Sequence, residues 1–308
     1  MMTGTDGAAG FLLKFGVLRA TGPRGRVLES GAMLTDYHVH LRPDDSDASA
    51  EEHYSSGNVE RYRTVASERG IEELGCAEHV YRFAQALDVW QHPLWRESAH
   101  DDIDAYVTFV REETDLKVGI EADFIAGRED RMATLLEARE WDFVVGSVHF
   151  IGEHAVDHDG YEVWDHRSSR PDELWRRYFE TLGEAARSGL FDILAHPDLI
   201  KYWGARRPVP EGDLRRFYDL AMDGIAQSRI AVEVSTAGLR KPAGELYPAS
   251  AFLEMCLDAG CPVALSSDAH VPGDVGRDYD DALELLERLG VKKLAVFEGR
   301  ERRLEPLG

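Results

Sequence analysis

Cysteine and long apolar stretches are scarce in this sequence, and both absences narrow what the protein can be. Only 3 of 308 residues are cysteine, without the Cys-x-x-Cys spacing of zinc and redox sites. Cys76, Cys256 and Cys261 lie in or beside apolar runs, so we expect small core residues in a reducing cytoplasm. No stretch approaches the roughly 18 apolar residues that cross a bilayer. Neither a disulfide scaffold nor a membrane-spanning protein is indicated.

Basic residues are also in short supply. The chain has 35 Lys and Arg against 57 Asp and Glu, which gives a formal net charge of −22. Such a surface repels the phosphates of nucleic acids and anionic membranes. We therefore expect neither a nucleic acid nor a membrane as a partner, and the composition points to no particular oligomeric state.

The first 32 residues are rich in glycine and basic in character. Their apolar run, 11–18 (FLLKFGVL), is short and is interrupted by Lys14, whereas a secretory signal needs a longer apolar core and a small-residue cleavage site. We predict a weakly ordered extension over 1–32, upstream of a candidate start at Met33, and a single domain over 33–308. The intact mass of the natively expressed protein tests this start.

From residue 33 onward, short apolar runs alternate with segments of helical period. The runs predict strands at 33–38, 71–79, 117–125, 142–150, 191–199, 230–238 and 262–270, with a weaker eighth at 293–299. The segments between them predict helices at 59–70, 104–113, 128–140, 172–189, 213–228, 249–260 and 280–290. This alternation is typical of a parallel sheet buried on both faces, and its length suits a closed β/α barrel. A doubly wound open sheet is the alternative, but no Gly-x-Gly-x-x-Gly follows the first strand.

His38 and His40 lie one residue apart on the first predicted strand, so their side chains share a face. A pair of half-buried, hydrogen-bonded histidines would explain this motif on its own. Five further strands, however, also end in residues that can bind a metal. These residues are Glu78, His79, Glu121, His149, His196, Asp268 and His270. Because the strand ends of a parallel barrel meet at one rim, and such a buried cluster is costly without metal ions, the pattern indicates a metal centre.

The number of candidate ligands bears on the number of ions. One metal of the zinc type takes three or four protein ligands, so these residues predict two or three divalent ions. Imidazole and carboxylate ligands do not distinguish zinc, manganese and iron. The loop after the first strand adds three acidic candidates, Asp44, Asp45 and Asp47, of which we favour Asp45.

Seven segments taken together resemble the motifs of the polymerase-and-histidinol-phosphatase (PHP) superfamily, and most closely its histidinol-phosphatase branch. The segments are HVH (38–40), EH (78–79), GIEADF (119–124), GSVHF (146–150), AHPDLIKYWG (195–204), STAGLRKP (235–242) and SDAH (267–270). The resemblance runs from about residue 34 to residue 300. It implies a distorted (β/α)7-type barrel, with a trinuclear metal centre that hydrolyses phosphomonoesters at the C-terminal ends of the strands.

The resemblance also implies roles for individual residues. His38, His40, Glu121 and Asp268 would hold one metal, and Glu121 would bridge to a second metal bound by His149 and His196. His79 and His270 would hold a third metal with an acidic residue of the first loop. Glu121, Asp268 and His270 would thereby serve catalysis as well as metal binding. In the family, a His or Asp often lies a few residues after the His-x-His motif, in a loop that also carries Cys and Gly in some members. Here the loop reads LRPDDSDAS (41–49), without His, Cys or Gly, so one of its aspartates would have to serve.

Phosphate ester hydrolysis requires a nucleophile and groups that neutralise the phosphoryl oxygens. A hydroxide that bridges two metals would supply the nucleophile, because a bound metal lowers the pKa of water to roughly 7. Basic residues beyond the strand ends would hold the phosphate, and we expect Arg240, then Lys201 and Arg206, in this role. A metal-bound water or a nearby acid would protonate the leaving group.

The expected substrate is a small phosphate ester, and the branch resembled favours L-histidinol phosphate, an intermediate of histidine biosynthesis. Another small phosphate or phosphotyrosine is the alternative within the same chemistry. An amidohydrolase-type C–N hydrolase also opens with His-x-His, but usually carries a carboxylated lysine on the fourth strand, where this chain has His149. A catalytically inactive metal-binding domain is a third alternative, and the complete set of candidate ligands speaks against it.

Overall fold

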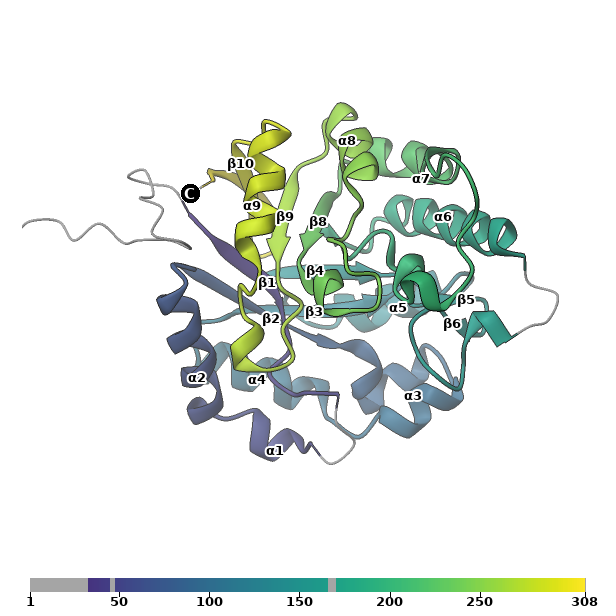
Figure 1. Cartoon of the computed structure of the whole chain (residues 1–308). Coiled ribbons are helices and arrows are strands. Elements are labelled where there is room, and N and C mark those ends of the chain that lie inside the picture. Colours follow the sequence, from purple (N-terminus) through teal and green to yellow (C-terminus); the bar gives the residue numbers. More distant parts are fainter. Residues whose placement is uncertain (1–32, 45–47, 166–169, 308) are drawn as a thin grey trace, which may run out of the picture.

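A computed structural model describes residues 33–44, 48–165 and 170–307, and seven parallel strands form its centre (Figure 1). Their order in the sheet is β1-β2-β3-β4-β7-β8-β9. The strands are β1 Thr35–Val39, β2 Glu73–His79, β3 Lys117–Asp123, β4 Phe143–Ser147, β7 Ile193–Leu194, β8 Ala231–Ser235 and β9 Val263–Ser266. The backbone N–H of His40 donates to Ala269 O at 2.8 Å, which joins β1 to the segment after β9. The sheet is therefore a nearly closed barrel, as predicted.

Each of the seven predicted barrel strands is present, although several are shorter than the apolar runs. The shortest, β7, keeps only two residues of the predicted 191–199. The predicted eighth strand also forms, as β10 (Lys293–Glu298), but it lies outside the seven-stranded sheet. It pairs antiparallel with β11 (Glu301–Pro306) to make a separate hairpin. A second small hairpin, β5 (Phe150–Ile151) and β6 (His154–Ala155), follows β4.

Helices cover the outside of the barrel (Figure 1). They are α1 Ala50–His53, α2 Ser56–Glu68, α3 Pro93–Ser98, α4 Ile103–Glu113, α5 Glu129–Glu137, α6 Pro171–Arg187, α7 Arg215–Ser228, α8 Ser250–Asp258 and α9 Tyr279–Arg288. All seven predicted helices are among them. Local chemistry sets their ends: the Asp102 carboxylate accepts from two backbone N–H groups at the start of α4, and Pro171 begins α6, where its missing N–H costs nothing.

The N-terminal end of the barrel, which we call the floor, is closed by apolar packing. Tyr37 packs edge-on against Phe143 and against Phe297 of the β10–β11 hairpin, with ring centroids 5.0 and 5.7 Å apart. Gly119 is required here, because a Cβ atom at this position would lie 2.2 Å from the Phe143 ring. The hairpin thus seals the floor and leaves the C-terminal ends of the strands as the open end of the barrel.

Two further predictions concern the N-terminal segment and the membrane. The predicted extension over 1–32 lies outside the described residues. Among the residues that the structure describes, none of the helices has both the length and the apolar character needed to cross a membrane.

Candidate metal centre

Histidines and carboxylates from six strands converge at the open end of the barrel. Glu121, at the end of β3, lies at the centre of this cluster and is 1% exposed. Its carboxylate oxygens lie 3.3 Å from His38 Nε2, 3.4 Å from His149 Nε2 and 3.1 Å from His196 Nε2. Asp268 also belongs to the cluster, and its Oδ1 lies 3.4 Å from His40 Nε2. The structure thus brings together residues that are more than 200 positions apart in the sequence.

Many of the facing atoms have no hydrogen-bond partner although they are buried. They are His38 Nε2, His40 Nδ1 and Nε2, Glu121 Oε2, His196 Nδ1 and Asp268 Oδ1. Burying polar atoms without partners costs free energy, so such a concentration calls for a ligand that accepts several lone pairs at once. Two sets of three ligand atoms lie within 4.8 Å of one another: one from His38, His40 and Asp268, the other from His38, Glu121 and His196. Divalent ions fit this donor set.

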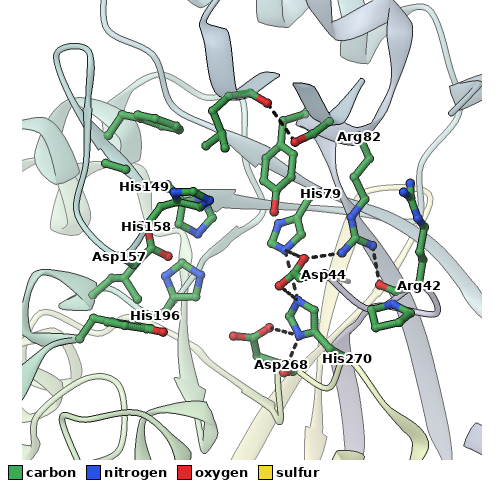
Figure 2. A pocket seen from close by; sticks show the side chains of 18 of the residues that line it. Arg42, Asp44, His79, Arg82, His149, Asp157, His158, His196, Asp268 and His270 are labelled. Carbon is green, nitrogen blue, oxygen red and sulfur yellow. Dashed lines mark hydrogen bonds and ion pairs between the residues drawn. The ribbon is translucent and has the colours of Figure 1, made fainter. Parts of the chain in front are cut away.

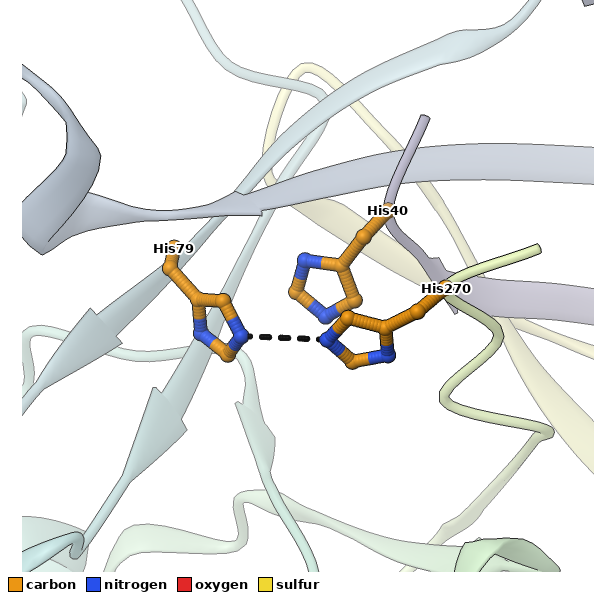
Figure 3. A group of neighbouring side chains, drawn as sticks. All are labelled: His40, His79 and His270. Carbon is orange, nitrogen blue, oxygen red and sulfur yellow. Dashed lines mark hydrogen bonds between the residues drawn. The ribbon is translucent and has the colours of Figure 1, made fainter. Parts of the chain in front are cut away.

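A third set lies beside the first two and consists of His40, His79 and His270 (Figure 3). The Nε2 atoms of His79 and His270 approach to 3.3 Å, so they cannot both carry a proton. Asp44, in the loop after β1, adds a carboxylate whose Oδ2 lies 3.2 Å from His270 Nε2. The favoured Asp45 and the alternative Asp47 lie outside the described residues.

Two carboxylates that the sequence analysis did not single out contact the histidine rings on the side away from the cluster. Glu233 on β8 accepts a hydrogen bond from His38 Nδ1 at 2.7 Å and another from the backbone N–H of His196 at 2.6 Å. Asp123 accepts from His149 Nδ1 at 2.7 Å. Each bond fixes the ring so that Nε2 faces the cluster, as the outer partners of metal-bound histidines do. A charged residue within a buried apolar run was the signal available in both strands.

The backbone is strained at two of the converging residues. His196 and Asp268 have φ angles of 23° and 50°, in the left-handed region that side chains other than glycine rarely adopt. Both follow the ends of their strands, β7 and β9, where the chain turns outward. Such strain persists where surrounding contacts hold it, and it is common at functional sites.

The cluster attracts positive charge. Burial alone would lower the pKa of His149, but the carboxylates of Glu121 and Asp123 raise it to about 10. Burial alone would raise the pKa of Glu121, but His79 and His38 hold it well below its ordinary value. The Glu121 carboxylate therefore stays ionised and stabilises whatever cations, protons or metal ions, occupy the space around it.

A pocket of about 500 Å³ opens above the cluster (Figure 2). His79, Asp44, His270 and Arg82 lie on one side of it, and His149 and His196 on the other. Lys241 also lines the pocket, with its Nζ 5.5 Å from the centre of the Tyr202 ring and no carboxylate of the described residues within ion-pair distance. It is the residue directly after Arg240, and the sequence analysis did not select it.

The three predicted phosphate-binding residues are placed differently. Arg240 donates to Ser267 O at 2.6 Å and so holds the loop that carries Asp268. Lys201 is buried, with Nζ 2.9 Å from an oxygen of Asp198, and Arg206 is exposed. None of these three predicted residues is among the described residues that line the pocket above the cluster.

A parallel barrel that gathers histidines and carboxylates at the C-terminal ends of its strands is an architecture of metal-dependent hydrolases. The chain belongs to the PHP domain family, whose model matches residues 36–237. A relative from Deinococcus radiodurans, named a probable histidinol-phosphatase, is 31% identical over 259 residues, which cover 82% of this chain and 94% of that protein. The histidinol-phosphatase of Bacillus subtilis is 24% identical over 254 residues, covering 75% and 94% of the two chains.

A solved structure shares the fold. The crystal structure of histidinol phosphate phosphatase from Lactococcus lactis, in complex with zinc, L-histidinol and phosphate, superimposes with a TM-score of 0.64. The two sequences are 21% identical, and the match covers 88% of this chain and 99% of that one.

Proposed function

We propose that the protein is a metal-dependent phosphomonoesterase that hydrolyses L-histidinol phosphate to L-histidinol and phosphate, a step of histidine biosynthesis in the cytoplasm. The carrying observation is the group of buried, partnerless ligand atoms at the base of an open pocket. The names of the relatives and the ligands of the Lactococcus lactis complex support the substrate. The three cysteines, all unpaired and buried, suit a reducing compartment.

Within this proposal, the clustered ligand atoms would together hold three divalent ions of zinc, manganese or iron, assigned to ligands as the family resemblance implies. The first ion would bind His38, His40, Glu121 and Asp268, the second Glu121, His149 and His196, and the third His79, His270 and Asp44. Bound ions would neutralise the phosphoryl oxygens and lower the pKa of a coordinated water to roughly 7. Asp44 replaces Asp45 as the favoured loop ligand because of its 3.2 Å approach to His270.

The chain's own residues would orient the ester. Lys241 lines the pocket without a carboxylate of the described residues within ion-pair distance, so its ammonium group is available to a phosphoryl oxygen. Glu233 and Asp123 keep the rings of His38 and His149 turned toward the ions. Arg240 would act indirectly, by holding the backbone beside Asp268.

The pocket also carries a carboxylate outside the proposed ligand set, on the side of His149 and His196, which suits a substrate with a cationic organic part. Asp157 is half-buried, lines the pocket, and makes no hydrogen bond or ion pair to the described residues. A free carboxylate in a pocket favours an ammonium or imidazolium group. L-Histidinol phosphate carries such groups, whereas a simple phosphomonoester does not.

Phosphate release from L-histidinol phosphate and from a panel of phosphomonoesters tests the proposal, before and after metal is stripped and manganese, zinc or iron is restored. We expect metal-dependent turnover with a strong preference for L-histidinol phosphate. Metal-dependent release without that preference would redirect the assignment to another small phosphate or phosphotyrosine. An absence of hydrolysis for every ester would contradict a phosphatase and favour C–N hydrolysis or an inactive metal-binding domain.

A further inference from the structure

Arg82 connects the end of β2 to the loop after β1. It closes the short 3-10 helix Val80–Arg82 directly after His79, and it is 3% exposed. Its Nη2 lies 2.5 Å from Asp44 Oδ1, and its Nη1 donates to Arg42 O at 2.5 Å (Figure 2). The same Nη1 donates to the carboxylate of Glu78. One buried guanidinium therefore bridges three acceptors on two chain segments.

The base of the loop is fixed independently of Asp44. Glu78 Oε1 accepts hydrogen bonds from the backbone N–H groups of Leu41 and Arg42 at 2.7 and 3.1 Å. Arg42 in turn pairs with Asp101 at 2.5 Å. Two of the groups that Arg82 contacts, Glu78 and the backbone of Arg42, are therefore held in place without Asp44. The Nη2 of Arg82 then reaches the Asp44 side chain.

Asp44 itself has little else to hold it. Its side chain is 59% exposed, and the described residues that approach its carboxylate within ion-pair distance are Arg82, His79 and His270. The two oxygens are divided between these partners: Oδ1 contacts Arg82, and Oδ2 lies 3.2 Å from His270 Nε2. Without Arg82, the carboxylate would rotate freely, at a cost in side-chain entropy for any ligand that had to fix it.

We infer that Arg82 is a positioning residue that holds Asp44 over the third ion and sets the affinity for that ion. The inference rests on the proposed metal centre. Arg82 occupies one oxygen of Asp44 and leaves the other for the ion, so that Asp44 acts through a single oxygen. A planar guanidinium can reach Glu78, Arg42 O and Asp44 together, whereas a lysine ammonium cannot span the same three acceptors.

The variant Arg82→Lys tests this inference, because it keeps the positive charge beside the buried Glu78 and removes only the fork. Manganese binding is measured by equilibrium dialysis with elemental analysis over a concentration series. We expect the dissociation constant of one ion to rise about tenfold to a hundredfold, the usual range for a lost outer partner, with the other ions unchanged. The matched control is Arg139→Lys, which alters the Arg139–Asp104 pair (2.7 Å) on the outer helices.

A double-mutant comparison separates positioning from a general structural role. If Arg82 acts through Asp44, then Asp44→Ala weakens the binding of the same ion measurably, and adding Arg82→Lys to Asp44→Ala produces no further weakening. Additive losses, or wild-type affinity in Arg82→Lys, would overturn the inference and leave the metal centre standing. A wild-type protein that binds none of manganese, zinc and iron would instead contradict the proposed function. Circular dichroism of each variant verifies that the compared proteins are folded.

Discussion

The two ends of the barrel are built from the same strands and differ in chemistry. At the floor, Tyr37, Phe143 and Phe297 pack their rings together and exclude water. At the open end, His38 follows Tyr37 by one residue and Glu121 follows Gly119 by two, yet these side chains are buried with unpaired ligand atoms. The floor is stable as it stands, whereas the open end is satisfied only by a bound ligand.

Burial of side chains therefore has different consequences at the two ends of the barrel. Apolar area removed from water stabilises the floor, and any substitution there acts on the free energy of unfolding. Buried ligands at the open end act on binding and catalysis. Substitutions at the two ends are therefore expected to separate into two classes, and three variants test that separation.

The largest effect is expected at the centre of the open end. Glu121→Gln removes the charge that faces five histidines, and an amide is a weak ligand for a divalent ion. Hydrolysis of L-histidinol phosphate should fall about ten-thousandfold, equivalent to about 5.4 kcal/mol, with loss of bound metal measured by elemental analysis. The control Glu73→Gln changes a carboxylate at the first residue of β2, at the floor of the barrel, and should keep activity within about twofold. Retention of a tenth of the activity by Glu121→Gln would contradict a bridging role.

The next effect is expected at the floor. Phe297→Ala removes a ring that is 1% exposed and should lower the free energy of unfolding by about 3–4 kcal/mol, measured by urea denaturation. The same variant should retain the kcat/KM and metal content of the folded protein. Leu304→Ala, in the same hairpin but 47% exposed, is the control and should change stability by about 0.5 kcal/mol or less. Loss of metal from folded Phe297→Ala would show that the two ends are not independent.

The smallest effect is expected at the wall of the pocket. Asp157→Asn should raise KM for L-histidinol phosphate about tenfold, since a charged hydrogen bond to a cationic group is worth about 1.4 kcal/mol. KM for p-nitrophenyl phosphate, whose organic part is uncharged, should stay within about twofold. Asp159→Asn, exposed in the same loop, serves as the control. Equal increases for both esters would mean that Asp157 does not recognise the organic part.

Much of the fold could be predicted, because each buried parallel strand is a continuous apolar run. The hairpin at the floor could not be predicted as such: β11, ERRLEP, is mostly exposed and carries little apolar signal. Because the sequence of β11 does not reveal a partner strand, the apolar run of β10 is indistinguishable from an eighth barrel strand. Its buried residues Ala295, Val296 and Phe297 pack against the floor of the barrel, and the strand itself lies outside the seven-stranded sheet.

The converging residues could be predicted because they end strands of a parallel barrel, whereas their outer partners could not. Glu233 lies in the middle of an apolar run, and only the fold places it against His38. Arg240 and Lys241 are adjacent in sequence, and the turn after β8 decides which of them lines the pocket. The direction of a side chain in an irregular loop depends on backbone angles that residue types alone do not determine.

The left-handed backbone at His196 and Asp268 links conformation to the occupancy of the site. Each such angle costs roughly 1–3 kcal/mol, and a ligand that binds only the native chain offsets that cost by mass action. Glycine would relax both turns but would supply no donor atom. At His196 and Asp268, ligand atoms are therefore supplied at the expense of backbone stability, and laboratory evolution for thermostability alone should tend to replace these residues.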